Sequence, residues 1–335
     1  MSLKFAVIGI DHRHAYGMTK HLIAAGADCV GWWTQGAPET EAGFVKRFPD
    51  LPKVADRRAL LDRPDVALVV IAAIPRDRAD LAIEAMRAGK DVMVDKPGCT
   101  TPEDLARIRA VQAETGRIWS IDFSERFEVP CVTMAEDLVQ GGAIGRVVQT
   151  VGLGPHRLNR ATRPGWFFDR DAYGGVLTDI ASHQIDQFLH FTGSQDAEIT
   201  HAAVENYAHP GDPGLQDFGE IALRSDKGRG YIRVDWFTPD ALPNWGDGRL
   251  TILGTEGYIE LRKYVDVAGR TGTDTLILVN GGRCEAIDAR DAGLPYFARI
   301  IADVQDRTET AMTQAHCFKV MELALQAQAM AEGTA

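Results

Sequence analysis

Three side chains in this sequence have the chemistry and the surroundings to move a proton to or from a bound molecule. Lys96 follows a short apolar segment and precedes Pro97, which restricts the backbone before it and predicts a lysine held in a turn. Asp179 and His183 are four residues apart, the spacing that places two side chains on one face of a helix. A carbinol loses a hydride only as its hydroxyl proton leaves, so that reaction needs a base beside the oxygen. We therefore take Lys96, Asp179 and His183 as candidate catalytic residues.

Either Lys96 or His183 could act as the base. A lysine that is buried beside a cationic ring gives up its proton more readily than a solvated one, because burial and like charge both disfavour the ammonium form. Asp179 could orient the imidazole of His183 or bind a substrate hydroxyl. The ordinary alternative is that Lys96 is a solvated turn residue and that Asp179 and His183 are a polar pair on a helix surface.

The first 122 residues alternate strand patterns with helix patterns. The continuous apolar run at residues 66–72 is typical of a parallel strand that is covered on both faces. The expected strands are residues 5–10, 29–33, 66–72, 91–94 and 119–122, and the expected helices are residues 14–25, 40–48, 57–61, 76–88 and a segment that opens at Thr101. This order predicts a doubly wound parallel sheet, and hence a first domain at residues 1–122.

From residue 123 to residue 335 the pattern changes to an α+β domain. Helices are expected at residues 131–140, around Asp179 and His183 up to Gly193, and at residues 296–331. Strands separated by turn signals are expected at residues 145–151, 199–207, 217–224, 229–237, 249–253, 257–261 and 275–280. These strands predict a mostly antiparallel sheet. The C-terminal helix is a candidate to pack back on the first domain.

The composition excludes several kinds of partner. The 335 residues carry 36 basic and 47 acidic side chains, a net charge of −11, without a basic run, so neither nucleic acid nor an anionic membrane surface is expected as a partner. No apolar stretch approaches the roughly 18 residues of a membrane span. The five cysteines are scattered and form no CxxC motif. They are typical of reduced thiols, so we expect a cytoplasmic protein without a structural metal.

An ordered series of motifs resembles the glucose–fructose oxidoreductase/inositol dehydrogenase (Gfo/Idh/MocA) family. The motifs are residues 6–9 (AVIG), 62–67 (DRPDVA), 85–92 (AMRAGKDV), 95–97 (DKP, where the family usually has EKP), 141–145 (GGAIG), 174–186 (GGVLTDIASHQID) and 254–260 (GTEGYIE). The resemblance implies a Rossmann domain, a second domain with an open sheet, and a nicotinamide cofactor. It also implies an NAD(P)-dependent dehydrogenase or reductase of the CH–OH group of a sugar, inositol or related polyol, with Lys96, Asp179 and His183 as catalytic residues.

The loop that should hold the cofactor departs from the glycine-rich signature. The G-x-G-x-x-G pattern has glycines for close approach of the pyrophosphate and for helix packing. Here only Gly9 remains, with Asp11 and His14 at the other two positions. Either the pyrophosphate still binds the amides at the helix start, with Arg13 or a histidine offsetting the charge of Asp11, or the phosphate site has been lost.

The remaining candidates follow from the same alignment. Thr34 ends the second strand, where an acid usually binds the adenosine ribose, so NAD and NADP both remain open, with a slight preference for NAD. The candidate cofactor-binding residues are Gly9, Asp11, His12, Arg13, His14, Thr34, Ala73, Pro75, Asp95 and Lys96. The candidate substrate residues are Arg163, Trp166, Asp179 and His183. Asp186, on the same expected helix, is either structural or functional.

Two other classes of function compete with this interpretation. Asp11, His12 and His14 after a first strand resemble the metal-binding opening of a hydrolase barrel, although the antiparallel second half does not fit a (β/α)₈ barrel. A non-catalytic sugar-binding or regulatory relative with a decayed cofactor loop is the third interpretation. The open sheet of the second domain, with one bare face, predicts a homodimer or homotetramer.

Overall fold

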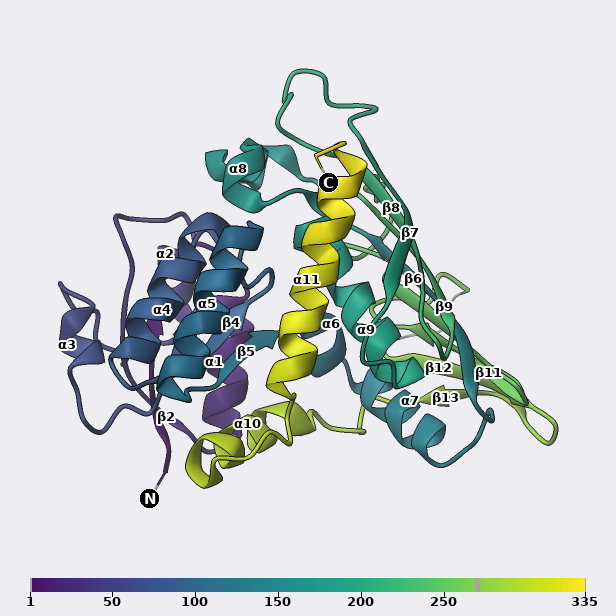
Figure 1. Cartoon of the computed structure of the whole chain (residues 1–335), viewed down its shortest axis with the longest axis horizontal. Coiled ribbons are helices and arrows are strands. Elements are labelled where there is room, and N and C mark those ends of the chain that lie inside the picture. The colour runs from purple at the N-terminus through teal and green to yellow at the C-terminus, as the bar shows by residue number, and fades with distance from the viewer. Residues whose placement is uncertain (1, 269–271, 335) are drawn as a thin grey trace. The chain divides into compact units, whose positions relative to one another are not determined.

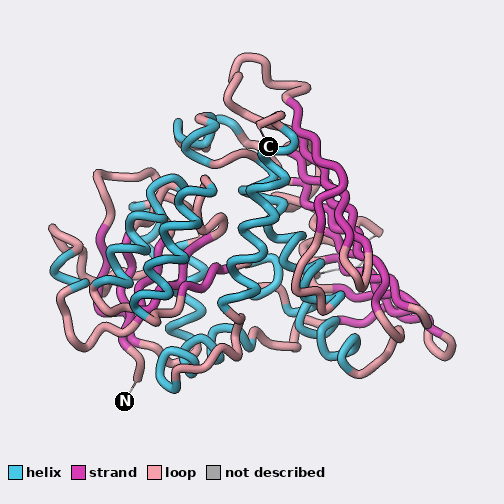
Figure 2. The backbone as a smooth tube through the Cα atoms, in the orientation of Figure 1, coloured by secondary structure: helices cyan, strands magenta, loops and turns pink. Residues whose placement is uncertain are grey.

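The computed structural model describes residues 2–268 and 272–334. The chain divides into two compact units, each built around one sheet (Figures 1 and 2). The first unit comprises Met1–Asp122, Asp171–Gly174 and Pro295–Met321, and the second comprises Phe123–Arg170, Gly175–Leu294 and Glu322–Ala335. The first unit therefore includes residues from the C-terminal part of the chain as well as the first 122 residues.

The sheet of the first unit has five parallel strands in the order β2-β1-β3-β4-β5. The strands are β1 (Lys4–Ile8), β2 (Asp28–Trp33), β3 (Leu68–Ile71), β4 (Asp91–Asp95) and β5 (Trp119–Asp122). Every residue of β3, β4 and β5 is buried, as expected for strands covered on both faces. The predicted doubly wound parallel sheet is confirmed.

The strand order reverses between β1 and β3. The chain runs from β1 through α1 (Ala15–Ala24) to β2 on one side, and from β3 through α4 (Arg78–Arg87) to β4 on the other. Because such crossovers are right-handed, α1 and α4 lie on opposite faces of the sheet. The reversal is a switch point, where the loops after β1 and β3 diverge and ligands of doubly wound folds bind.

The remaining helices of the first unit follow the predicted order, except that the short helix α8 was not predicted and the C-terminal tail differs. They are α2 (Glu41–Arg47), α3 (Arg58–Leu61), the short helix η1 (Pro75–Asp77), α5 (Pro102–Thr115), α8 (Arg170–Tyr173) and α10 (Pro295–Asp306). The single helix expected at residues 296–331 is wrong, because the chain breaks after α10 and resumes as α11 (Gln314–Ala331). The Asp303 carboxylate accepts hydrogen bonds from the amides of Thr310 and Ala311, and these bonds fix the connecting loop.

The second unit contains an eight-stranded sheet in the order β13-β12-β11-β10-β6-β9-β8-β7. The strands are β6 (Val147–Pro155), β7 (Glu198–Glu205), β8 (Phe218–Arg224), β9 (Arg229–Asp235), β10 (Arg249–Gly254), β11 (Gly257–Arg262), β12 (Thr275–Asn280) and β13 (Cys284–Asp288). All neighbours are antiparallel except β6 and β9, so the predicted mostly antiparallel sheet is confirmed. The sequence did not predict the edge strand β13.

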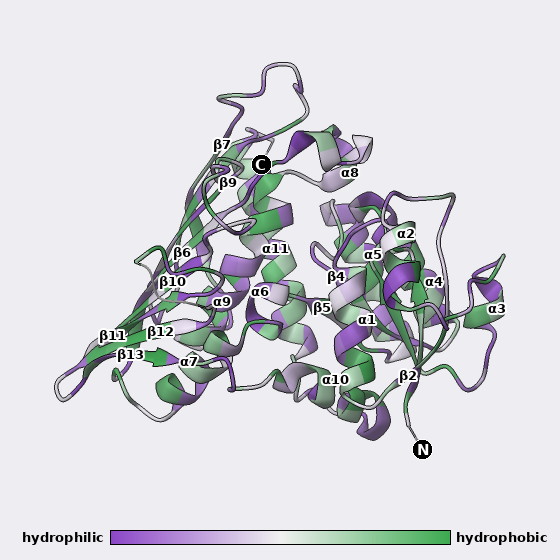
Figure 3. Cartoon of the chain, turned by 180° about the vertical axis from the view of Figure 1, so that it is seen from behind, coloured by the Kyte–Doolittle hydropathy of each residue, from purple (hydrophilic) through white to green (hydrophobic). Residues whose placement is uncertain are grey.

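The helices of the second unit are α6 (Ser124–Phe127), α7 (Pro130–Gln140), η2 (Arg160–Thr162), η3 (Gly165–Phe168), the π-helical turn η4 (Leu177–Ala181) and α9 (Ser182–Thr192). α7 packs on β11 and β12, and α9 packs on β6. Strand residues alternate between buried and more exposed positions, and green hydrophobic segments run through the strands in Figure 3. Among the helices of residues 2–268 and 272–334, none is long and apolar enough to cross a membrane.

Candidate active site

The switch point of the first sheet brings Gly9 and Ala73 into direct contact. Gly9 follows β1 with a φ of +79°, and a Cβ added there would lie 2.5 Å from the Cβ of Ala73. The amide of Gly9 donates to the carbonyl of Trp33 at 2.8 Å, and the amide of His12 donates to the carbonyl of Ala72 at 2.9 Å. Only glycine fits this close approach without strain, which explains why the first glycine of the signature is retained.

Arg78 organises the turn that holds Lys96. The guanidinium is fully buried and donates from Nη1 to the carbonyls of Asp95, Lys96 and Pro97 at 2.9, 2.5 and 3.0 Å. Its Nε donates to the carbonyl of Ala73 at 2.8 Å. One arginine therefore ties the end of β4 to the end of β3. Lys96 itself is 5% exposed and directly follows β4, so it is not a solvated turn lysine.

The carboxylate of Asp95 lies at the centre of a buried charge cluster. Its Oδ2 accepts from Arg78 Nη2 at 2.8 Å, and both side chains are fully buried. Burial alone would favour the neutral acid, but the charge of Arg78 and hydrogen bonding outweigh it, so the pKa of Asp95 is well below its usual range. The residue is consequently an anion throughout the neutral range.

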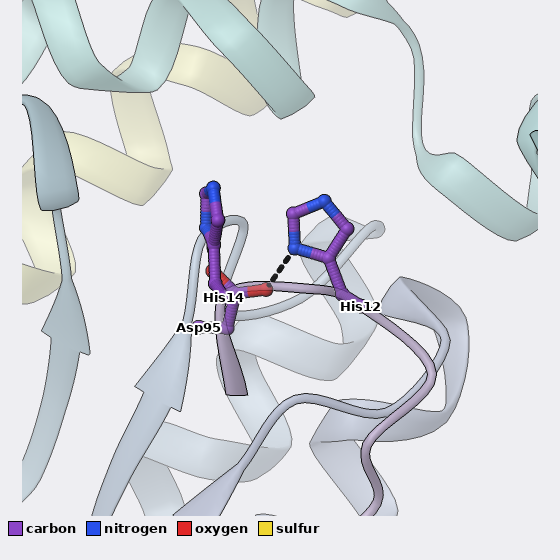
Figure 4. Close-up of side chains that lie close together, drawn as sticks. All are labelled: His12, His14 and Asp95. Carbon is purple, nitrogen blue, oxygen red and sulfur yellow. Dashed lines mark hydrogen bonds and ion pairs between the residues drawn. The ribbon is translucent and has the colours of Figure 1, made fainter. Parts of the chain in front are cut away.

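Two histidines of the loop after β1 contact the same carboxylate. His12 Nδ1 lies 2.7 Å from Asp95 Oδ2, and His14 Nδ1 lies 2.8 Å from Asp95 Oδ1 (Figure 4). Burial and the neighbouring His14 lower the pKa of His12 to about 3, against the opposing effect of Asp95. His12 is therefore a neutral imidazole at pH 7, and its Nδ1 carries the proton that Asp95 accepts.

The other candidate cofactor residues surround this loop. Asp11 is half-buried, and desolvation raises its pKa to about 6. Arg13 is exposed at the surface of the loop. Thr34, directly after β2, is 4% exposed, and Pro75 is buried at the start of η1. The sheet therefore gathers the predicted cofactor residues of the first unit at the carboxyl ends of β1, β2, β3 and β4.

Asp179 and His183 lie on a distorted helix in the second unit. Asp179 belongs to η4 and His183 to α9, and they are 7% and 2% exposed. A π-helical turn widens the helix at this point, a feature common at functional sites. The start of the helix is held by the C-terminal helix α11, because Gln328 Oε1 accepts from the amide of Leu177 at 3.0 Å. Gly175 makes room for this glutamine, since a Cβ there would lie 2.3 Å from its side chain.

A second buried charge pair, Glu125 and Lys263, holds helix α9 in place. Glu125 Oε2 accepts from Lys263 Nζ at 2.7 Å and from Gln184 Nε2 at 3.0 Å, and Lys263 also donates to Gln187 at 3.0 Å. Burial of Glu125 favours the neutral acid, but the charge of Lys263, together with charge interactions with His183 and His156, outweighs burial and lowers the pKa of Glu125 to about 2. The two glutamines belong to α9, so this pair fixes the helix that carries His183.

Asp186, which lies on α9, forms a bidentate ion pair that helps to fix this helix. Arg126 donates from Nε and Nη2 to the two oxygens of Asp186, both at 2.7 Å, and the carboxylate is fully buried. Both carboxylate oxygens of Asp186 therefore accept hydrogen bonds from a residue of α6. Of the two roles open to Asp186, the geometry fits the structural one.

The expected substrate residues Arg163 and Trp166 lie on the loop that precedes the distorted helix. Arg163 stacks over the rings of Phe167 and Trp236, with its guanidinium carbon 4.5 and 5.1 Å from their centroids. Its Nε donates to the carbonyl of Leu158 at 2.9 Å. Trp166 is partly buried in η3. These contacts give Arg163 a role in bracing the loop.

Several residues that build the site were missed from the sequence. Arg78 and Lys263 are single basic residues in segments without a motif, and nothing in their spacing separates a buried cation from a surface one. Glu125 and Arg126 lie in α6, a few residues after β5, and the carboxyl ends of strands are the one general signal that could have singled them out. Gln328 lies far along the chain from the helix that it binds.

Comparisons with known proteins agree with this architecture. The model of an oxidoreductase family with an NAD-binding Rossmann fold, GFO_IDH_MocA, matches residues 3–123. The model of the GFO/IDH/MocA C-terminal domain matches residues 132–260. The crystal structure of a "putative oxidoreductase" from Erwinia carotovora atroseptica SCRI1043 is 45% identical, with a TM-score of 0.95 over 98% of this chain and 99% of that chain.

Two curated enzymes align over smaller parts of the chain. Levoglucosan dehydrogenase of Pseudarthrobacter phenanthrenivorans is 30% identical over 59% of this chain and 51% of its own length. The NAD(+)-dependent scyllo-inositol 2-dehydrogenase of Bacillus subtilis is 24% identical over 77% of this chain and 73% of its own length. The chain thus spans about half the length of the first of these enzymes.

The chain belongs to the Gfo/Idh/MocA family of oxidoreductases, as both of its family domains and its fold agree. The predicted family and fold class are confirmed. The alternative of a metal-dependent hydrolase built on Asp11, His12 and His14 is not favoured, because the second half of the chain is an antiparallel sheet domain and not part of a (β/α)₈ barrel.

Proposed function

We propose that this protein is an NAD(P)-dependent dehydrogenase or reductase that acts on the CH–OH group of a sugar, inositol or related polyol. The observation that carries the proposal is the buried position of Lys96. It directly follows β4 in an NAD-binding Rossmann unit, in a turn whose carbonyls Arg78 holds. A lysine is seldom buried unless it is paired or functional.

The first unit has features that fit a nicotinamide dinucleotide. Gly9 packs closely on Ala73 and makes the tight turn after β1 that the first glycine of the signature serves. The pyrophosphate would bind at the start of α1, because the N-terminus of a helix favours an anion. Thr34 provides no carboxylate that would exclude a 2′-phosphate, and we keep the slight preference for NAD. The bound cofactor would supply the hydride acceptor or donor.

The chemistry of the chain's own residues follows from this assignment. Either Lys96 or His183 is the base that removes the hydroxyl proton of the substrate. Asp179 orients the imidazole of His183 or binds a neighbouring hydroxyl. Trp166 and Arg163 are proposed to contribute to the substrate site, with Trp166 as the apolar wall. The names of the relatives, which act on levoglucosan and scyllo-inositol, support a sugar or polyol as substrate.

We also propose the setting in which this enzyme works. Residues 1–122 and 123–335 form the cofactor and substrate domains, with part of the C-terminal region returning to the first. The bare face of the eight-stranded sheet supports a homodimer or homotetramer. The cysteines of this sequence support a cytoplasmic location.

A titration of the purified protein tests the proposal. NAD(H) and NADP(H) are added separately while nicotinamide fluorescence is followed, and the better oxidised cofactor is then supplied with levoglucosan, scyllo-inositol and a panel of sugars and polyols. We expect one cofactor to bind and its absorbance at 340 nm to rise with at least one polyol. Binding of neither cofactor would refute the proposal.

A further inference from the structure

The helix that carries Asp179 and His183 begins directly after two glycines. Gly174 and Gly175 have φ angles of +89° and +86°. The first amides of a helix have no partner within the helix, and a short polar side chain at its start usually supplies one, which glycine cannot do. The amide of Asp179 donates to the carbonyl of Gly175 at 2.8 Å. The amides of residues 176–178 therefore need acceptors from other parts of the chain.

Two glutamines that are distant in the sequence accept these hydrogen bonds. Gln216, in the loop between β7 and β8, accepts from the amide of Val176 at 2.9 Å. Gln328 on α11 accepts through Oε1 from the amides of Leu177 at 3.0 Å and Thr178 at 3.4 Å. Gln328 is 3% exposed, so its oxygen caps the helix at a place where an unpaired amide would be costly.

A carboxylate joins the two glutamines. Oε1 of Glu332 accepts from Nε2 of Gln328 at 2.9 Å and from Nε2 of Gln216 at 2.7 Å. Arg170 fixes this carboxylate, because it donates from Nη2 to Oε2 of Glu332 at 2.8 Å. Nε2 of Gln328 also donates to Oε1 of Gln216 at 3.0 Å, so its oxygen must face the helix. We call Gln216, Gln328 and Glu332 the glutamine clamp.

Gly175 admits the clamp to the start of the helix. A Cβ at this position would lie 2.3 Å from the side-chain amide of Gln328. Its φ of +86° is also a conformation that glycine adopts without strain. The glycine therefore removes the local cap and makes room for the distant one.

The capped amides lie in the π-helical turn that carries Asp179. This turn, η4, begins at Leu177, whose amide Gln328 accepts. A π-helical turn is rare and occurs mostly as a single turn within an α-helix, often at a functional site. Its other end continues into α9, which Glu125 holds through Gln184. The turn is thus fixed from both ends, and the clamp provides the contact at its start.

We propose that Gln328, together with Gln216 and Glu332, positions Asp179 for the proton transfer by fixing the start of its helix. This inference rests on the proposed function. Without the clamp the helix start is free to move, and Asp179 no longer orients His183 or meets a substrate hydroxyl. A misplacement of about 1 Å can lower the rate by about a hundredfold. Cofactor affinity should change far less, because the clamp belongs to the second unit.

The experiment uses the full-length protein and compares Gln328→Met with Gln326→Met. Methionine keeps the length of the side chain and removes the amide group. Gln326 lies on the same helix but is exposed, which makes it the matched control. For each protein we measure kcat with the best polyol, the Kd of the reduced cofactor, and hydrogen exchange at residues 176–181 by mass spectrometry. Gln328→Met is also combined with Asp179→Asn.

We expect Gln328→Met to lower kcat by about ten- to a hundredfold and to speed hydrogen exchange at the helix start. In the Asp179→Asn background the same change should lower kcat by less than about threefold, because the residue that the clamp positions is already impaired. Gln326→Met should match the wild type in every measurement.

Two results would overturn the inference and leave the proposed function standing. One is a wild-type kcat in Gln328→Met, and the other is an equal loss of kcat in both backgrounds, which would mean that the glutamine supports the fold in general. If Gln328→Met does not fold, Gln216→Met, which keeps Gln328 in place, is judged by the same two results. A wild type that reduces neither NAD nor NADP with any polyol would overturn the proposed function and the inference with it.

Discussion

The contacts of the Asp95 carboxylate could not be predicted from residue types alone. The DKP motif predicted Lys96 as a functional residue, and the loop motif raised the question of His12 and His14. No pattern in the sequence predicted that Asp95 contacts both histidines and Arg78, because these contacts join β1, β4 and α4 across the sheet. Motifs identify residues near one another along the chain, whereas a charge cluster is made by the fold.

The raised pKa of Asp11 predicts a pH-dependent gain in stability when its charge is removed. The pKa of Asp11 is about 6 in the folded protein, against an ordinary value of 3.8. Ionisation of this carboxyl therefore lowers the stability of the folded protein as the pH rises from 3.8 through 6. Asp11→Asn should therefore stabilise the protein by at most about 3 kcal/mol at pH 8, and its advantage should grow by about 1 kcal/mol between pH 5 and pH 8. Urea unfolding at the two pH values measures this.

Asp50→Asn is the matched control for that change, because Asp50 is an exposed carboxylate of the same unit. It should alter the unfolding free energy by little and equally at both pH values. An Asp11→Asn variant whose advantage does not grow with pH would show that the carboxyl of Asp11 is solvated in the folded protein.

At the scale of elements, periodicity predicted the strands and helices that bury a face. The apolar runs of β1, β3 and β4 and the turn signals between the later strands were sufficient for both sheets. Edge strand β13 was missed because its residues are mostly exposed and show no alternation. The break before α11 was missed because Asp303 fixes it through side-chain bonds to the following loop. The π-helical turn was missed because the sequence shows only that Asp179 and His183 are four residues apart. That spacing is equally typical of a regular α-helix.

The buried pair of Glu125 and Lys263 predicts an asymmetric response to substitution. Lys263→Met leaves the carboxylate of Glu125 buried without its cation, a change that costs about 3–5 kcal/mol. In Glu125→Gln/Lys263→Met the charge is gone from both partners, so the double variant should recover a large part of that loss. Urea unfolding at pH 7 gives both numbers.

Lys46→Met on α2 provides the control, since this lysine is exposed. It should change the unfolding free energy by less than about 0.5 kcal/mol. A double variant as unstable as Lys263→Met alone would mean that packing of the lysine stem, and not the unpaired charge of Glu125, accounts for the effect.

For the whole molecule, the sheet of the second unit sets the expected assembly. On β10 and β11, Leu253 and Tyr258 are directly paired and are 40% and 38% exposed, and Tyr231 on β9 is 36% exposed. Large apolar side chains on a sheet face are covered in many proteins by a second subunit. Leu253→Glu/Tyr258→Glu should therefore convert a dimer or tetramer to a monomer in light scattering at micromolar concentration.

Val45→Glu places the same charge at an apolar residue that is 44% exposed on α2, and should leave the molar mass unchanged. A wild-type protein that is already a monomer at micromolar concentration would contradict the proposed assembly. The sequence could predict a bare sheet face from its antiparallel strands, but not which residues lie at its centre.

The central claim is that Lys96 and His183 carry out the proton transfer that accompanies hydride transfer to a nicotinamide. The direct measurement is kcat for nicotinamide reduction at 340 nm, with the best polyol substrate, in wild type, Lys96→Ala, His183→Ala and the control Lys20→Ala, an exposed lysine of α1. The Kd of the reduced cofactor is determined for each protein. We predict that kcat falls by at least about a hundredfold in the first two variants and stays near the wild-type value in the control, while cofactor affinity changes far less. Lys96→Ala and His183→Ala variants that retain wild-type kcat would contradict the claim.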